Sequence, residues 1–144
     1  MKYYFIPYHI VKDKIQGIIE QNKDDFSKNY GDVSVDYNHF ETLSALGMAY
    51  VSIAVQDDVV GFAGFVLNHN ATHEGVEAEN VVFYIKKPYR GKLFDELVEY
   101  SKKELAKIGV PKISVTIKSN ILARSLKSKG FKKQYEIWEM DING

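Results

Sequence analysis

The sequence predicts a mixed α/β (α+β) fold, with the element order β-α-α-β-β-β-α-β-α-β around one sheet. Three observations lead to this prediction. The length of 144 residues is typical of a single domain, which we expect to span residues 1–144. A content of 45% hydrophobic and 26% charged residues is that of a globular protein. The apolar residues switch repeatedly between the alternation of strands and the spacing of helices.

The first three elements are a strand and two helices. Residues 2–7 are short, aromatic and β-prone, and Pro7 ends this strand. From Ile10, apolar residues fall on one face of an amphipathic helix, namely Ile10, Ile15, Ile18, Ile19 and Phe26. A short second helix follows at Tyr37, Phe40, Leu43 and Leu46. Asp36 or Asn38 can cap its start, and Gly47 ends it.

Three strands come next. Residues 51–56 and 59–67 read as a hairpin whose turn is Asp57-Asp58. Residues 76–85 form the fourth strand of the chain, which Pro88 stops. Simple alternation places one set of its residues on a single face, namely Glu77, Glu79, Val81, Phe83 and Ile85.

The last third alternates helices and strands. A long helix begins after Gly91 and ends at Gly109, ahead of Pro111. A strand at residues 113–117 and a short helix at residues 121–129, closed by Gly130, follow. Residues 131–142 complete the predicted sheet as a final strand.

Composition excludes several classes of protein. The chain has no cysteine, which rules out disulfide frameworks, thiolate metal sites and a cysteine nucleophile. No stretch approaches the roughly 18 apolar residues of a membrane span, and the start lacks a cleavage signal. We therefore expect a cytoplasmic protein with no membrane partner.

The net charge of zero hides a strong asymmetry. Residues 1–80 hold 5 Lys/Arg against 12 Asp/Glu, a net charge of −7, whereas residues 81–144 hold 14 against 7, a net charge of +7. One interpretation is that the later part binds a polyanion and the earlier part a cation. The other is an unevenly charged solvated surface.

Residues 81–93 carry the pattern that best suits ligand binding. They run from a strand through an Arg90-Gly91 turn into the long helix. Such a turn directs unpaired backbone N–H groups and the positive end of the helix dipole at one point, which favours a phosphate. Lys86, Lys87 and Lys92 add positive charge. The alternative is a basic loop that only connects two elements.

This segment resembles the GNAT superfamily of acetyl-CoA-dependent N-acetyltransferases. In that family a V-x-P-x-Y-R-G-x-G-x-G/A stretch leads into the helix that holds the coenzyme A pyrophosphate, as Ile85 to Asp95 does here. Residues 119–131 are similar to the family's N-x-x-A…G-F segment. The resemblance covers nearly the whole chain and is strongest to short, divergent members such as those of phages. It implies a mostly antiparallel sheet, acetyl-CoA as co-substrate, and coenzyme contacts from Phe83, Ile85, Arg90, Gly91, Lys92, Leu93, Phe94 and Asn120.

The resemblance also implies a reaction, the transfer of acetyl to a primary amine of an unidentified small molecule or protein. The thioester oxygen would accept a hydrogen bond from the backbone N–H of Ile85. Glu79, with Glu77 beside it, would be the base; the alternative is that both are exposed strand residues. Tyr84, Tyr89 or solvent would protonate the thiolate.

Three positions depart from the family pattern. Leu93 and Asp95 replace glycines of the loop, and Leu126 stands where many members have a tyrosine acid. These departures allow a second hypothesis, a catalytically inactive GNAT-fold protein that binds another macromolecule.

Other chemistries find little support in the sequence. There is no G-x-S-x-G elbow, phosphate-binding P-loop or dinucleotide fingerprint. His69 and His73 lack an evident third ligand, so we expect no metal site. Two arginines are few for sequence-specific nucleic-acid binding, and we expect no nucleic-acid partner, although a base as acceptor would share the fold. A homodimer is compatible with all of these readings.

Overall fold

The computed structural model describes residues 1–25, 35–69, 75–115, 124, 126–133 and 140–142. Five strands of this part of the chain form one sheet in the order β1-β2-β3-β4-β5. Their bounds are β1 Lys2–Pro7, β2 Ala49–Gln56, β3 Asp58–His69, β4 Val76–Ile85 and β5 Lys112–Val115. Neighbouring strands are antiparallel except β4 and β5, which are parallel. The predicted mixed, mostly antiparallel sheet is therefore confirmed.

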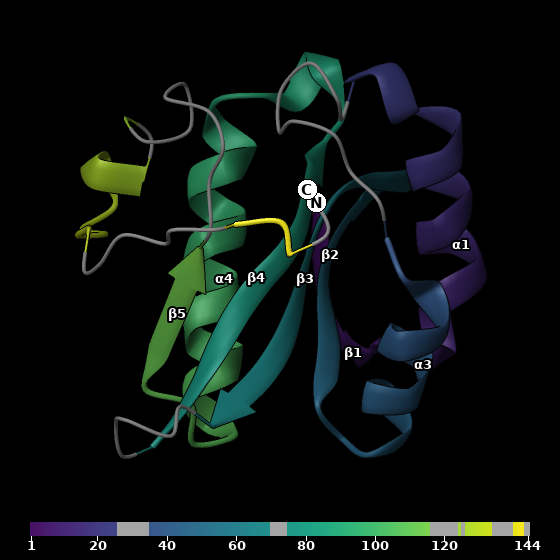
Figure 1. Cartoon of the computed structure of the whole chain (residues 1–144). Helices are drawn as coiled ribbons and strands as arrows, with labels where there is room; N and C mark the ends of the chain where they lie inside the picture. The colour runs from purple at the N-terminus through teal and green to yellow at the C-terminus, as the bar shows by residue number, and fades with distance from the viewer. Residues whose placement is uncertain (26–34, 70–74, 116–123, 125, 134–139, 143–144) are drawn as a thin grey trace.

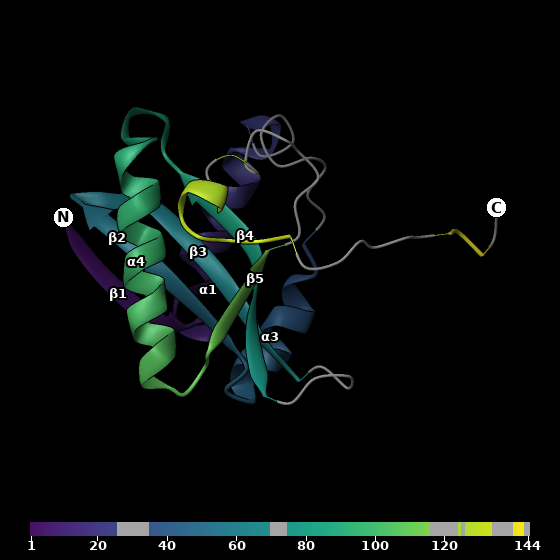
Figure 2. The same cartoon turned by 90° about the vertical axis from the view of Figure 1, so that its left-hand side faces the viewer.

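Helices cover both faces of this sheet. They are α1 Tyr8–Gln21, α3 Tyr37–Ala45 and α4 Lys92–Lys107, with a short 3-10 turn, η1 Lys87–Tyr89, before α4. α4 lies on one face, and α1 and α3 lie on the other (Figures 1 and 2). No helix in the described part of the chain is long and apolar enough to cross a membrane.

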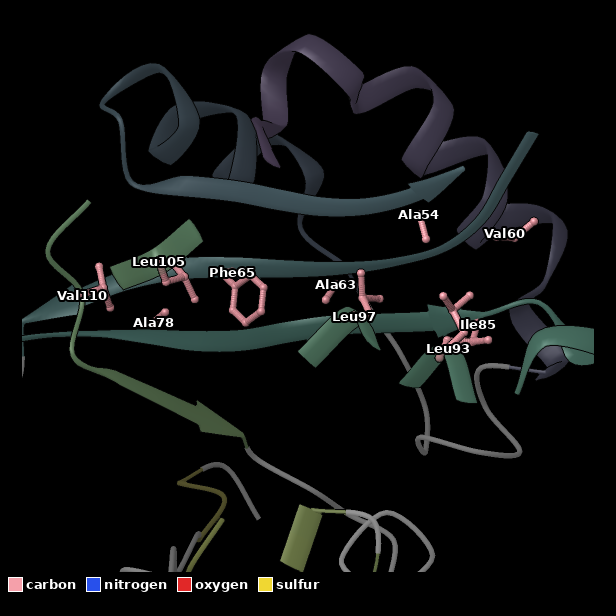
Figure 3. Close-up of a cluster of buried hydrophobic side chains, with 10 residues drawn as sticks. All are labelled: Ala54, Val60, Ala63, Phe65, Ala78, Ile85, Leu93, Leu97, Leu105 and Val110. Atoms are coloured by element: carbon pink, nitrogen blue, oxygen red, sulfur yellow. The ribbon is translucent and has the colours of Figure 1, made fainter. Parts of the chain in front are cut away.

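Two hydrophobic cores follow from this layering. The first lies between α4 and the sheet and includes Phe65, Ile85, Leu93 and Leu97 (Figure 3). The second lies between the sheet and the layer formed by α1 and α3, and it includes Ile15, Val51, Phe62 and Tyr84. The middle of β3 is buried on both faces of the sheet, because it contributes to both cores. Its sequence is therefore a continuous run of apolar residues rather than an alternation of apolar and polar ones.

Several predicted boundaries are confirmed, and one differs for a tertiary reason. Residues 2–7 and 76–85 are strands as predicted, and the Asp36 side chain caps α3 by accepting the backbone N–H of His39 at 3.0 Å. α1 begins at Tyr8 rather than Ile10, because the Ser44 hydroxyl on α3 accepts the His9 backbone N–H at 2.9 Å. Such a cap from another element leaves no local sequence signal.

The end of the chain is described only in part. The long helix is confirmed as α4, and residues 124 and 126–128 are helical, in agreement with the predicted short helix. Residues 116–117 and 121–123 lie outside the described residues. The predicted final strand is wrong at its described ends, since residues 131–133 and 140–142 join no strand of the described sheet. Its middle, residues 134–139, lies outside the described residues.

Candidate active site

A β-bulge interrupts the pairing of β3 with β4. Phe65 pairs with Asn80 and Gly64 pairs with Val82, so Val81 is an extra residue on β4. Gly64 makes this close approach possible, because a Cβ added there would lie only 2.7 Å from Val82 Cγ1. A glycine inside an apolar strand was the one sequence signal that could have indicated the bulge.

The Asn80 side chain hydrogen-bonds to the backbone of both strands at the bulge. Its Nδ2 donates to the backbone carbonyl oxygens of Gly64 and Val82, each at 3.0 Å. Partly buried carbonyl groups of an interrupted ladder need such partners. Asn80 is thus a structural residue of the site that sequence reasoning missed.

Because of the bulge, the side chains of β4 are distributed over the two faces of the sheet differently from the prediction. Ala78 and Ile85 both belong to the core beneath α4, although simple alternation would place them on opposite faces. Glu79, next to Ala78, therefore lies on the α1–α3 face with Tyr84 rather than with Ile85. The prediction that one face holds all of Glu77, Glu79, Val81, Phe83 and Ile85 is wrong. The extra residue, Val81, shifts the alternation of side chains by one position, so odd-numbered residues before and after it lie on opposite faces.

Glu79 has a defined partner on this face. Asn68 Nδ2 donates to Glu79 Oε2 at 2.6 Å, and both side chains are half-buried. The hydrogen bond orients the carboxylate beside the bulge. Asn68 is opposite Glu77 in the strand register, so the two predicted carboxylates flank one amide.

Tyr84 lies in the core under α1. Its ring packs 5.8 Å from that of Phe62, and its hydroxyl is 3.4 Å from Asn22 Oδ1. Burial raises the pKa of Tyr84, the charge of Asp25 raises it further, and Arg90 partly opposes the change. The phenol therefore keeps its proton at neutral pH.

The described part of β5 accompanies only the first part of β4. β5 pairs with β4 only at Glu77–Asn80, and the remainder of β4 toward Ile85 has no β5 partner among the described residues. Figure 1 shows β4 continuing past the end of β5 toward the end of the sheet where η1 and the start of α4 lie.

The backbone polar groups of Ile85 face away from β3. Lys86 N–H donates to the Val60 carbonyl at 2.8 Å, so in an antiparallel ladder the polar groups of the preceding residue point away from β3. The carbonyl of Ile85 accordingly accepts Arg90 Nε at 2.9 Å. The Ile85 N–H points in the same direction, as a donor to a thioester oxygen would have to do.

Arg90 connects two parts of the fold. Besides Ile85, it contacts the Asp25 carboxylate through Nη2, and both side chains are about 30% exposed, at 29% and 31%. The predicted phosphate ligand is thus engaged with the segment that follows α1. Asp25 is a second residue that sequence reasoning missed, since 65 positions separate it from Arg90.

α4 begins at a glycine, which has no side chain to cap the helix. Gly91 is its N-cap with φ of 106°, a conformation that favours glycine, and it makes no side-chain hydrogen bond. Lys92 is 90% exposed and lies 3.8 Å from Glu96. The Leu93 side chain is buried in the core, so only its backbone N–H is oriented toward the helix start. Asp95 forms an ion pair with Lys129 at 3.4 Å, which balances the carboxylate that replaces a family glycine.

The aromatic residues of the predicted coenzyme site lie together. Phe83 and Phe94 make an edge-to-face contact with ring centroids 5.3 Å apart, and both line a cavity between α4 and the sheet. Asn120 and His73 lie outside the described residues. Among the described residues no group of three His, Asp or Glu side chains is arranged to hold a metal ion.

The fold matches solved structures of acetyltransferases over nearly its whole length. An aminoglycoside acetyltransferase from an uncultured soil metagenomic sample, in complex with sisomicin, has a TM-score of 0.72 and 14% identity, covering 98% of this chain and 95% of its own. An aminoglycoside N-acetyltransferase in complex with CoA has a TM-score of 0.71 and 12% identity, covering 97% of this chain and 98% of its own. A ribosomal-protein-alanine N-acetyltransferase from Brucella melitensis biovar Abortus 2308 has a TM-score of 0.66 and 13% identity, covering 99% of this chain and 100% of its own.

These similarities define the fold. No protein-family model and no curated protein sequence matches the chain. The chain nevertheless has the GNAT fold that the sequence resemblance implied, with its parallel β4–β5 pair.

Proposed function

We propose that this chain is an N-acetyltransferase that transfers acetyl from acetyl-CoA to a primary amine. The observation that carries the proposal is the Ile85 backbone, which faces away from β3 and is followed along the chain by the N-terminus of α4 at Gly91. A thioester oxygen can accept the Ile85 N–H, and a diphosphate fits the N–H groups at the start of α4. The GNAT fold supports this placement, since one protein of that fold is in complex with CoA.

In the proposed reaction, the amine nitrogen attacks the thioester carbonyl carbon. A C–N bond forms, the carbonyl oxygen becomes an oxyanion that accepts the Ile85 N–H, and the C–S bond then breaks. The proton lost by the nitrogen passes through water to Glu79, which Asn68 orients and which lies six residues from Ile85 along β4. Solvent, rather than Tyr84, protonates the departing thiolate, because the Tyr84 side chain lies in the core under α1.

The charge distribution supports a cationic acceptor. Glu79 lies on the sheet face covered by α1 and α3, within the half of the chain whose net charge is −7. A field of this sign raises the local concentration of a protonated amine. The basic residues near the start of α4, on the other half, favour the coenzyme phosphates.

Calorimetric titration with acetyl-CoA tests the coenzyme site. We expect binding that Lys92→Ala weakens about fivefold, as loss of about 1 kcal/mol from a charged contact predicts. Lys103→Ala is the matched control, because this exposed lysine of the same helix lies far from its start and loses the same charge. Absence of binding at millimolar acetyl-CoA would contradict the proposal and favour the macromolecule-binding hypothesis.

A thiol-release assay with a panel of primary amines tests the transfer itself. The chain has no cysteine, so a thiol reagent reports only the CoA released. Glu79→Gln is expected to lower kcat by about 10²- to 10⁴-fold, the usual contribution of a general base. Unchanged coenzyme affinity in this variant separates the base from the binding site.

A further inference from the structure

An apolar cavity lies beside the last described pair of β4 and β5. Asn80 and Val115 form the last pair between the two strands, and both residues line the cavity on the α4 side of the sheet. Phe83, the neighbouring β4 residue on that side, lines it as well. Phe94, in the first turn of α4, lines it too, so the cavity reaches from the last described β4–β5 pair to the start of α4.

Its lining suits a hydrocarbon group. Besides these residues, Phe65, Val98 and Leu126 border the space. The polar side chains of the lining have protein partners: Asn80 Nδ2 bonds two carbonyls, and the Ser101 hydroxyl lies 2.8 Å from both Leu97 O and Ser52 Oγ. Water in such a space would find few partners, whereas an apolar group would gain dispersion contacts.

The cavity is large enough for a short chain and no more. Its volume is about 40 Å³. One water-sized sphere needs roughly 10–15 Å³ on this measure, so the cavity holds about three such spheres. A methyl or methylene group is of similar size, which sets the limit at a few carbons.

We propose that this cavity holds the acyl chain of the coenzyme A thioester, and that donors with three or four acyl carbons bind more tightly than acetyl-CoA. The proposal rests on the proposed function, in which the coenzyme enters at α4 and its thioester oxygen accepts the Ile85 N–H. Phe83, two residues before Ile85 on β4, lines the cavity, so the acyl group of that thioester lies beside it. The reaction is unchanged, and only the group that moves from sulfur to nitrogen is longer.

Titration calorimetry with CoA, acetyl-, propionyl-, butyryl- and hexanoyl-CoA tests this proposal without knowledge of the acceptor. Each methylene that enters the cavity is expected to lower Kd about fourfold. The gain therefore continues from acetyl to butyryl and stops at hexanoyl. CoA without an acyl group serves as the internal reference.

Val98 allows a matched pair of variants at one position. Val98→Leu adds a methylene to the wall and is expected to abolish the advantage of butyryl-CoA over acetyl-CoA. Val98→Ala removes two methyl groups and is expected to extend the advantage to hexanoyl-CoA. The Kd of CoA itself stays constant in both, so that a general loss of structure is distinguished from a change of chain-length preference.

The outcomes separate the two proposals. If neither CoA nor any thioester binds, the proposed function fails. If all thioesters bind equally, or acetyl-CoA binds most tightly, the coenzyme site stands and the acyl cavity is refuted. A preference for longer chains that both Val98 variants leave unchanged also refutes it, because the chain would then lie elsewhere.

Discussion

Gly64→Ala tests the bulge that orients the candidate site. The new Cβ would lie 2.7 Å from Val82 Cγ1, closer than side-chain carbons pack. The contacted atom belongs to a β-branched side chain with one preferred rotamer, so the backbone must shift. Overpacking of this kind costs about 1–3 kcal/mol in the free energy of unfolding. For 144 residues, each 1 kcal/mol lowers Tm by roughly 3 °C.

A double-mutant cycle with Val82→Ala isolates this contact. Val82→Ala removes Cγ1, so Gly64→Ala should cost less than about 0.5 kcal/mol in that background. Urea unfolding of the four proteins gives the free energies, and calorimetry gives the Tm values. If Gly64→Ala costs the same in both backgrounds, the two residues are not in contact and the deduced register of β3 with β4 is wrong.

Three further predictions follow from individual contacts. Gly17→Ala should raise the free energy of unfolding by about 0.5–1 kcal/mol in urea titrations, because an added Cβ inside α1 meets nothing within 4 Å; a destabilised variant would contradict the packing of α1. Asp25→Asn and Arg90→Ala should be coupled by about 1 kcal/mol in a double-mutant cycle of unfolding free energies, and additive effects would show that the ion pair contributes nothing. Burial, with a hydrogen bond to Glu96, raises the pKa of Tyr3 to about 12, from an unfolded value near 10. The stability this provides is complete below pH 10 and is lost as pH rises toward 12, so Tyr3→Phe should show a smaller alkaline loss in unfolding titrations, and equal losses would contradict the assignment.

Local patterns were sufficient for most of the fold. The strands at residues 2–7 and 76–85 agree with the sequence, as do the Asp36 cap and the turn at Asp57, whose φ is 64°. Each depends on side chains within a few positions of one another, so the sequence carries the signal directly. The order of elements, together with the Arg90-Gly91 turn, was enough to indicate the GNAT fold.

The candidate site depended on contacts that no local pattern contains. Sequence alternation placed Glu79 with Ile85, whereas pairing with β3 introduced the bulge at Val81 and turned Glu79 to the opposite face. Arg90 looked free to bind phosphate until the fold brought Asp25 beside it.

The sequence by itself thus determined most of the elements, the charge of each half and the glycine that starts α4. Only the tertiary structure decided which way Glu79 faces, what Asn80 bonds to and which residues of β4 pair with β5. The physical reason is that helix periodicity and capping are properties of one segment. Strand register belongs to two segments at once, and a single extra residue on one of them exchanges the faces of every position beyond it.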